Sequence, residues 1–165
     1  MILASCPLDG LTGHEAGRKL LAQLYRQETG EDLPAIRKLP RGKPCFDSGD
    51  WHFSISHTPK HAFCAMSKNN IGIDAEELDR KVNLRLAEKI LSPAEKRRFD
   101  AAEDKERALL TFWVLKEAAA KVSGEGLRGY PNHTDFSLDD PRVTEREGCL
   151  VAVLEDIEEG VTYAV

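Results

Sequence analysis

Hydrophobic residues near the start of the chain recur at the spacing of a helix. Within residues 13–28, Ala16, Leu20, Leu21 and Leu24 fall on one side of a helical period, and Gly30 follows as a stop signal. The pattern therefore predicts an amphipathic helix over residues 13–28.

The period shortens after a Pro/Gly-rich link at residues 39–44. Residues 51–57, 61–67 and 71–77 are short runs of apolar or β-forming residues, separated by turn residues. We expect these three runs to form a three-stranded meander.

Helical spacing returns in the middle of the chain. Residues 82–91 and 92–124 are predicted as helices, with Ser92 as N-cap, proline at the first helical position and Gly124 at the end. Strand-like segments follow at 134–138, 149–154 and 161–165. The order helix–sheet, helices–sheet predicts an α+β fold in a single domain.

Composition narrows the class of protein. The chain has 165 residues, 41% of them apolar, which suits one compact domain, and its net charge of −5 argues against general affinity for nucleic acid or an acidic membrane. It contains no apolar run long enough to span a bilayer and starts without an export signal, so we expect a cytoplasmic protein. The four cysteines are scattered without a CxxC pair, which predicts reduced, mostly buried thiols.

Two carboxylates follow each other in the third strand-like run. The strand period of two places Asp74 and Glu76 on one face, opposite Ile73 and Ala75. Paired carboxylates on a strand suit Mg²⁺, which keeps some waters and binds substrate phosphates. The alternative is a solvated acidic edge strand, because DxE is an unspecific pattern.

Three charges lie in the most apolar of the predicted helices. Trp113, Glu117 and Lys121 share one stripe at four-residue spacing, with Lys116 on its flank. An exposed Glu117–Lys121 pair would explain two charges on a wet face. A helix with so little polar surface favours a site that uses the charges, since unpaired buried charges are costly.

Further polar residues offer contacts to an anion. Ser56, His57 and Thr58 end a strand and could donate to a phosphate, although a β-turn with a surface histidine explains the same residues. Lys43 in a tight turn and Arg18 are candidate anion contacts, since neither a P-loop nor a GxGxxG motif occurs.

Two other chemistries are not favoured by the residues around the strand ends. A serine hydrolase is not indicated, because no GxSxG elbow accompanies Ser54 or Ser56. Zinc binding by His52, His57 and His61 is not indicated either, because these histidines lack partners at recognised spacings.

Taken in order, four segments resemble one family. They are Gly42-Lys43-Pro44, FSISHT, IGIDAEE and FWVLKEAAAKVSGEGL, and they resemble the motifs of the Sfp-type 4′-phosphopantetheinyl transferases. The resemblance runs from about residue 13 to the end of the sequence. It implies two pseudosymmetric α/β halves, roughly 1–77 and 78–165, with the active site between them.

The resemblance also implies a reaction. Members transfer the 4′-phosphopantetheine arm of coenzyme A to a serine of an apo acyl or peptidyl carrier protein, with Mg²⁺, and release adenosine 3′,5′-bisphosphate. By motif matching, Asp74, Glu76 and Glu117 would bind the metal, with Glu117 as the base, directly or through a water. Lys116 and Lys121 would face the diphosphate.

The remaining motif residues would contact the nucleotide part of coenzyme A. Ser56 and His57 would approach the adenylate phosphates, Lys43 would lie beside the adenosine, and Arg18 would meet the 3′-phosphate. Two acids stay open as additions to the site: Glu77 as an alternative metal ligand, and Glu95 near the pocket. Glu95 is equally explained as an acid at the start of a helix, where the helix dipole favours it.

Further expectations concern the carrier protein, the oligomeric state and the alternative to a transferase. Lys96, Arg97 and Arg98 could meet the acidic helix of a carrier from fatty acid, polyketide or nonribosomal peptide synthesis, or could be a solvated helix face. We expect a monomer. The alternative to a transferase is a noncatalytic module that binds coenzyme A or a carrier protein.

Overall fold

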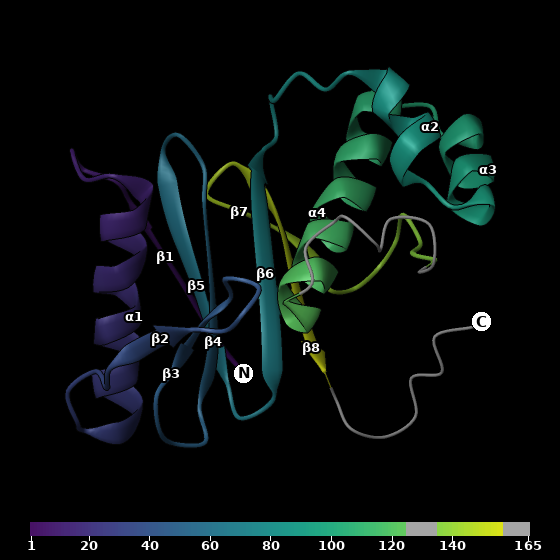
Figure 1. Cartoon of the computed structure of the whole chain (residues 1–165). Helices are drawn as coiled ribbons and strands as arrows, with labels where there is room; N and C mark the ends of the chain where they lie inside the picture. Colours follow the sequence, from purple (N-terminus) through teal and green to yellow (C-terminus); the bar gives the residue numbers. More distant parts are fainter. Residues whose placement is uncertain (125–134, 157–165) are drawn as a thin grey trace.

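The computed structural model describes residues 1–124 and 135–156 (Figure 1). Its elements in chain order are β1 (Ile2–Pro7), α1 (Gly13–Thr29), β2 (Ile36–Lys38), β3 (Pro44–Phe46), β4 (His52–His57), β5 (His61–Ser67), β6 (Asn70–Glu77), a 3-10 turn (Leu84–Leu86), α2 (Ala87–Ile90), α3 (Pro93–Ala101), α4 (Lys105–Ser123), β7 (Val143–Arg146) and β8 (Cys149–Asp156). Helices and sheets are mixed, so the predicted α+β class is confirmed.

The first part of the molecule is a three-stranded sheet covered by α1. The strand order is β1-β5-β4, with both pairs antiparallel, and α1 packs Leu20, Leu21 and Leu24 against Phe53 and Met66. The predicted first helix is confirmed, including its end at Gly30, which adopts a left-handed conformation. A capping box between Thr12 and Glu15, which the sequence pattern alone did not identify, starts the helix.

The predicted meander is correct for two strands and wrong for the third. β4 and β5 form the expected hairpin, but β6 pairs with β8 in a second sheet of order β6-β8-β7. Pairing with β8 lets Ile71 and Ile73 of β6 pack in one cluster with Phe63 of β5 and Val151 of β8. The division between the two sheets therefore falls before β6 and not after Glu77.

Serine side chains connect the two sheets. The Ile73 amide donates to Ser54 Oγ at 3.1 Å, and the Ala75 amide donates to Ser56 Oγ at 3.2 Å. These bonds take the place of backbone pairing between β4 and β6, which lie side by side in the middle of the fold. The alternate serines of β4 thus have a structural function.

Helices cover the outer side of the second sheet. α4 packs on β6 and β8, with α2 and α3 beyond it (Figure 1). The predicted helix over 92–124 is broken after Ala101, because Asp104 starts α4 by accepting from the Arg107 amide at 2.9 Å. The predicted caps at Ser92 and Gly124 are confirmed. The predicted helix over 82–91 is reduced to the 3-10 turn and α2.

Gly72 allows α4 to approach β6 closely. A Cβ placed on Gly72 would lie 2.0 Å from the Ala118 carbonyl oxygen and 2.7 Å from the Val122 amide nitrogen. Any side chain there would push the helix away from the strand. The glycine therefore sets the distance between Asp74 of β6 and Lys121 of α4.

Several short strands were not predicted. β1, β2, β3 and β7 are absent from the sequence-based assignment, whereas β8 confirms the run at 149–154. Residues 135–138 of the predicted strand 134–138 are not a strand. The predicted strand 161–165 lies outside the described residues.

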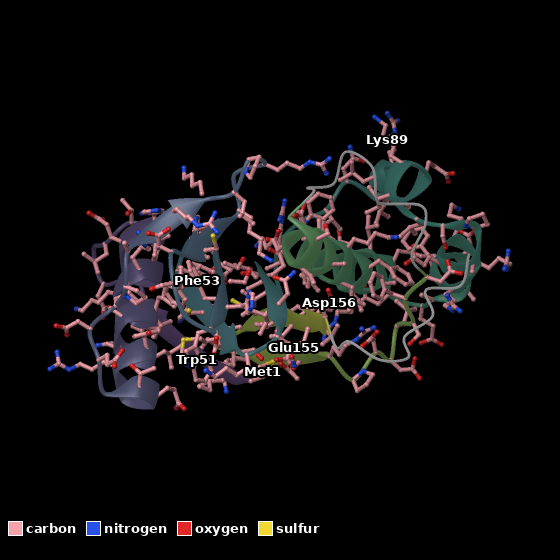
Figure 2. The ribbon with its side chains drawn as sticks, turned by 60° about the horizontal axis from the view of Figure 1, so that its bottom comes forward. Met1, Trp51, Phe53, Lys89, Glu155 and Asp156 are labelled. Carbon is pink, nitrogen blue, oxygen red and sulfur yellow. The ribbon has the colours of Figure 1, made fainter. Side chains whose placement is uncertain are left out.

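Labelled residues mark the end of the sheets and the helical side of the molecule in Figure 2. Figure 2 shows Met1, Trp51 and Glu155 together at the end of the sheets, while Lys89 projects outward from α2 on the helical side.

None of the helices in the described ranges has the length and hydrophobicity needed to cross a membrane.

Candidate active site

A pocket lies where β4 and α4 face each other. Its lining includes Lys43, Ser54, Glu117, Lys121 and Gly124. Asp74 and Glu76 of β6 lie beside it, on the strand between β4 and α4. Five of the charged residues singled out in the sequence thus come from three separate segments to one region.

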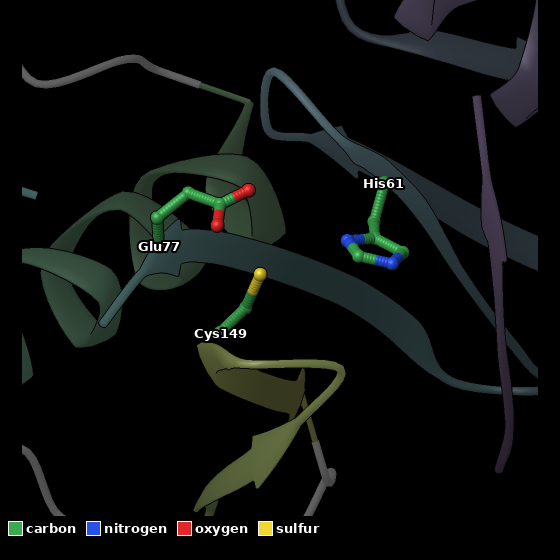
Figure 3. A group of neighbouring side chains, drawn as sticks. All are labelled: His61, Glu77 and Cys149. Atoms are coloured by element: carbon green, nitrogen blue, oxygen red, sulfur yellow. The ribbon is translucent and has the colours of Figure 1, made fainter. Parts of the chain in front are cut away.

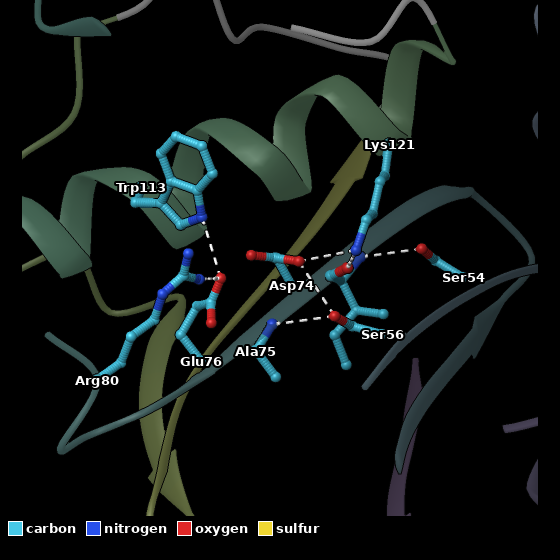
Figure 4. Close-up of polar contacts among 9 residues, drawn as sticks. Ser54, Ser56, Asp74, Ala75, Glu76, Arg80, Trp113 and Lys121 are labelled. Carbon is cyan, nitrogen blue, oxygen red and sulfur yellow. Dashed lines mark hydrogen bonds and ion pairs between the residues drawn. The ribbon is translucent and has the colours of Figure 1, made fainter. Parts of the chain in front are cut away.

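Asp74 is the most constrained carboxylate of this region. Its Oδ1 accepts from Lys121 Nζ at 2.7 Å and from Ser56 Oγ at 3.0 Å (Figure 4). Its Oδ2 is buried and makes no hydrogen bond with any of the described residues. A buried carboxylate oxygen without a partner is costly, and a cation would satisfy it.

Glu76 lies on the same face of β6 as Asp74, as the strand period predicted. It is held by an ion pair with Arg80 and by Trp113, whose Nε1 donates to Glu76 Oε1 at 3.1 Å (Figure 4). Trp113 therefore positions an acid rather than only packing the helix. Arg80 is a site neighbour that sequence reasoning missed; its four-residue spacing from Glu76 was the available signal.

Glu117 is half-buried between these acids and Lys121. Burial, followed by the negative charges of Asp74 and Glu76, raises the pKa of the Glu117 carboxyl, and the Lys121 ammonium partly offsets the rise. Glu117 lines the pocket with Lys121, which donates to Asp74, and Glu76 is bonded to Trp113 of the same helix, so the three carboxylates share one region. Hard oxygen ligands gathered in this way fit Mg²⁺.

The three carboxylates do not form a closed ligand cage. Within residues 1–124 and 135–156, the group whose ligand atoms do all lie within 4.8 Å of one another is a different one: His61, Glu77 and Cys149. By strand alternation Glu77 lies on the opposite face of β6 from Glu76, and it pairs with Lys60 at 2.9 Å. The suggestion that Glu77 is an alternative ligand with Asp74 is therefore wrong.

Lys121 of α4 places its side-chain amine at the pocket. Its Nζ donates to Asp74 Oδ1 at 2.7 Å and to the Ile73 carbonyl at 2.9 Å, and its side chain is 31% exposed. The ammonium is thus fixed at the acids while one side stays open to the pocket. This position fits its predicted place at a diphosphate.

Lys116 does not accompany Lys121. Its Nζ forms an ion pair with Glu95 Oε2 at 2.8 Å, and the two side chains are 3% and 0% exposed. Positions 116 and 121 lie about 140° apart around a helix, so they face different neighbours. The structure thus contradicts the assignment of Lys116 to the diphosphate.

Glu95 has a structural position as well. Besides Lys116, it accepts from the Ser92 amide at 2.9 Å and the Phe136 amide at 3.0 Å. It fastens the start of α3 to α4 and to the chain before β7. Of the two interpretations of Glu95, a place near the pocket or an acid at the start of a helix, the structure agrees with the second, because Glu95 forms the capping box with Ser92.

The end of β4 presents one of its two predicted phosphate contacts. Ser56 is buried, donates to Asp74 and accepts from Ala75, so its hydroxyl is committed to the strands and is not offered to a phosphate. His57 is exposed and lies against the start of α1, where a Cβ on Gly13 would come within 2.3 Å of its ring. Arg18 is partly exposed on the same helix, but it does not line the pocket.

Lys43 closes the pocket on the side of Gly124. Its Nζ donates to Asn70 Oδ1 at 2.5 Å and to the Val122 carbonyl at 2.7 Å. Burial lowers the pKa of the Lys43 ammonium to about 8. The lysine thus links the β2–β3 segment to the end of α4, and its charge is sensitive to mild alkali.

Lys43→Met is expected to remove one component of the pH dependence of stability. Because the folded pKa is about 8 and the unfolded one about 10.4, the unfolded chain holds more protons between these values, and stability rises with pH there. Urea unfolding of both proteins from about pH 7 to 10 measures this. The wild-type free energy of unfolding should rise relative to the variant's; a constant difference would contradict the lowered pKa of the half-buried Lys43.

The chain matches known proteins over most of this site. A sequence model of the 4′-phosphopantetheinyl transferase superfamily matches residues 70–155. The chain is 37% identical over 121 residues to 4′-phosphopantetheinyl transferase Sfp of Bacillus subtilis, covering 71% of this chain and 52% of that protein. It is 27% identical over 136 residues to psf-1 of Bacillus pumilus and 31% identical over 119 residues to gsp of Aneurinibacillus migulanus, both named 4′-phosphopantetheinyl transferases.

Each match covers a larger share of this chain than of the relative. They span 81% and 71% of this chain but 54% and 48% of psf-1 and gsp, so the chain spans about half the length of the curated relatives it matches. The family match includes Asp74, Glu76, Glu117 and Lys121. The chain therefore belongs to the 4′-phosphopantetheinyl transferase superfamily, and the resemblance of its motifs to the Sfp type is confirmed.

Proposed function

We propose that this chain transfers the 4′-phosphopantetheine arm of coenzyme A to a serine of an apo acyl or peptidyl carrier protein. The observation that carries the proposal is the meeting of Asp74, Glu117 and Lys121 at one pocket, with a buried oxygen of Asp74 left unpaired. The names of its relatives support the same reaction. The second product is adenosine 3′,5′-bisphosphate.

The acids would hold Mg²⁺. Asp74 offers Oδ2, while Glu117 carries a raised pKa that a nearby cation would lower again. Glu76 is the third candidate, oriented by Trp113 and Arg80. The ion, when bound, would neutralise charge on the diphosphate of coenzyme A.

Glu117 is the proposed general base. The carrier serine hydroxyl gives its proton to Glu117, directly or through a water, as its oxygen attacks the phosphorus that bears the pantetheine arm. The bond from that phosphorus to the adenylate oxygen breaks, and the adenosine bisphosphate leaves with the electron pair. A carboxyl whose pKa is raised by burial is better matched to this task than an ordinary exposed one.

Lys121 is proposed to stabilise the charge that develops on the diphosphate oxygens. Its ammonium is already fixed by Asp74 and Ile73, so little reorganisation is needed when a phosphate arrives. Lys43 would lie beside the adenosine, and His57 and Arg18 would meet phosphates at the start of α1. Of these three residues, Lys43 is the one that lines the pocket.

The architecture supports a site between two halves. We infer that β1-β5-β4 with α1 and β6-β8-β7 with α4 are related halves of a single domain, since each is a three-stranded sheet covered by a helix. The pocket lies where they adjoin. We also propose a monomer that acts in the cytoplasm without nucleic acid or membrane partners, in line with its acidic charge.

The carrier contact is proposed on α3. Of the three basic residues of α3, Lys96 is paired with Glu88 and Asp100, and Arg98 donates to the Phe136 carbonyl. Arg97 is exposed and is the better candidate for the acidic helix of a carrier.

The reaction is tested by intact mass spectrometry of carrier proteins. The chain is incubated with coenzyme A, Mg²⁺ and a panel of apo acyl and peptidyl carriers. We expect at least one carrier to gain the mass of one phosphopantetheinyl group, located on its serine by fragmentation. If no carrier in the panel gains mass, the chain is better described by the alternative, a module that binds coenzyme A or a carrier without catalysis.

A further inference from the structure

A second group of ligand-type side chains lies on the other face of β6. His61 begins β5, Glu77 ends β6 and Cys149 begins β8, so three strand ends meet there (Figure 3). Each residue offers one atom, and the three atoms all lie within 4.8 Å of one another. This cluster plays no part in the transfer proposed above.

The fold itself brings the three residues together. Glu77 is directly opposite Cys149 in the antiparallel pairing of β6 with β8. Strand alternation turns Glu77 away from the face of Asp74 and Glu76. His61 is fixed by the tight turn before β5, in which Thr58 and His61 pair through their backbones at 2.8 Å.

Two of the three ligand atoms lack a hydrogen-bond partner among the described residues, while Cys149 Sγ makes long contacts with the Thr58 hydroxyl at 4.0 Å and the Glu147 carbonyl at 3.6 Å. His61 Nδ1 and Glu77 Oε1 are buried and make no hydrogen bond with residues in the described ranges. The second oxygen of Glu77 is already used by Lys60, at 2.9 Å. Because Glu77 is only 8% exposed, leaving Oε1 unsatisfied is costly.

We propose that His61 Nδ1, Glu77 Oε1 and Cys149 Sγ form a binding site for a zinc-class divalent metal. Imidazole, carboxylate and thiolate are the ligand types that Zn²⁺ takes in proteins, whereas Mg²⁺ prefers oxygen alone. The glutamate and the thiolate together balance the charge of the ion. Binding breaks the S–H bond of Cys149, forms a metal–sulfur bond and releases the proton to solvent.

A nucleophilic function for the same residues is not favoured. A cysteine near a histidine and an acid has the residue types of a catalytic triad. Cys149, however, is 0% exposed, so a substrate carbon or phosphorus has no access to its sulfur. A metal ion needs far less room than a substrate and can be bound by a buried thiolate.

The metal would join the two sheets. His61 belongs to the sheet β1-β5-β4, while Glu77 and Cys149 belong to β6-β8-β7. A bound ion would therefore act as a cross-link across this boundary, on the side opposite to the transfer pocket. No sequence pattern indicates this site, because the three ligands are far apart in the chain and form no short motif.

Cobalt titration provides the direct test. Co²⁺ added to the metal-free protein is expected to produce a thiolate-to-cobalt charge-transfer band at one equivalent, which the oxygen ligands of the Asp74 region cannot produce. Cys149→Ser and His61→Gln should each lose this band. Cys45→Ser, which alters a thiol outside the cluster, is the matched control and should keep it.

Thermal unfolding gives a second measurement. At a free Zn²⁺ concentration about one hundred times the Kd, the wild-type Tm should rise by about 5–10 °C, and the rise should disappear in His61→Gln. Circular dichroism of each metal-free variant shows whether it folds; if buried Cys149→Ser does not, the partly exposed His61→Gln decides. No charge-transfer band in wild type, or an unchanged band in folded His61→Gln, would overturn the proposal.

Discussion

Replacing Glu117 with glutamine is expected to lower the rate of phosphopantetheine transfer by roughly 10²–10⁴-fold, the usual contribution of a general base. The amide cannot accept the serine proton and is a weaker metal ligand. The same change should not lower the stability of the metal-free protein, because it removes a negative charge that burial and Asp74 make unfavourable. Loss of function without loss of stability is typical of a residue retained for chemistry.

The pH dependence of stability follows from the direction of the shift. The folded pKa of Glu117 is raised, so the folded state holds the extra proton above the unfolded pKa of about 4.3. Stability contributed by this proton is present at lower pH and is lost as the pH rises through the folded pKa. Glu117→Gln should therefore unfold at a urea concentration equal to or above that of wild type at neutral pH.

Glu106→Gln is the matched control for this variant. Glu106 lies in the same helix and pairs at 3.1 Å with the exposed Lys81, an interaction of little energetic weight. Transfer and stability should both stay near the wild-type values. A Glu117→Gln variant that kept transfer within a few-fold of wild type would show that another group accepts the proton.

Lys116→Met is expected to destabilise the protein by about 3–5 kcal/mol, because it leaves the Glu95 carboxylate buried and unpaired. Lys121→Met, five residues away, should lose less stability, because its side chain is 31% exposed and Asp74 keeps the hydrogen bond from Ser56, but it should lose most of the transfer activity. Urea unfolding and a transfer assay on both variants measure the contrast. Similar stability losses in the two variants would contradict the different positions of the two lysines.

A double-mutant cycle separates the ion pair from other effects at the same place. Glu95→Gln in the Lys116→Met background should recover part of the lost stability, since no charge then remains buried. Recovery should be incomplete, because Glu95 also accepts from the Ser92 and Phe136 amides. Strictly additive losses would mean that Lys116 and Glu95 do not interact in solution.

Features that depend on neighbouring residues were predictable from the sequence. The helix of Leu20, Leu21 and Leu24, the cap at Ser92 and the end at Gly124 each rest on a few consecutive positions. The common face of Asp74 and Glu76 follows from the strand period in the same way. Short strands such as β2 and β3, each three residues long, carry too few positions for a period to be recognised.

Features that depend on distant partners were not predictable. Nothing within residues 71–77 indicates that β6 pairs with β8 and meets β4 through serine hydroxyls. Helical spacing separates Lys116 from the stripe of Lys121, but it does not reveal that Glu95 lies opposite. Likewise, His61 and Cys149 are brought to Glu77 by the topology of two sheets, which no short pattern encodes.

The central claim is that the pocket of Asp74, Glu117 and Lys121 transfers the phosphopantetheine arm to a carrier serine. Its most direct measurement counts both products of one reaction: modified carrier by intact mass, and adenosine 3′,5′-bisphosphate by chromatography. We expect equal amounts of the two products with Mg²⁺, and neither product in the presence of a chelator. Nucleotide release without carrier modification, or no product with any carrier in the panel, would contradict it.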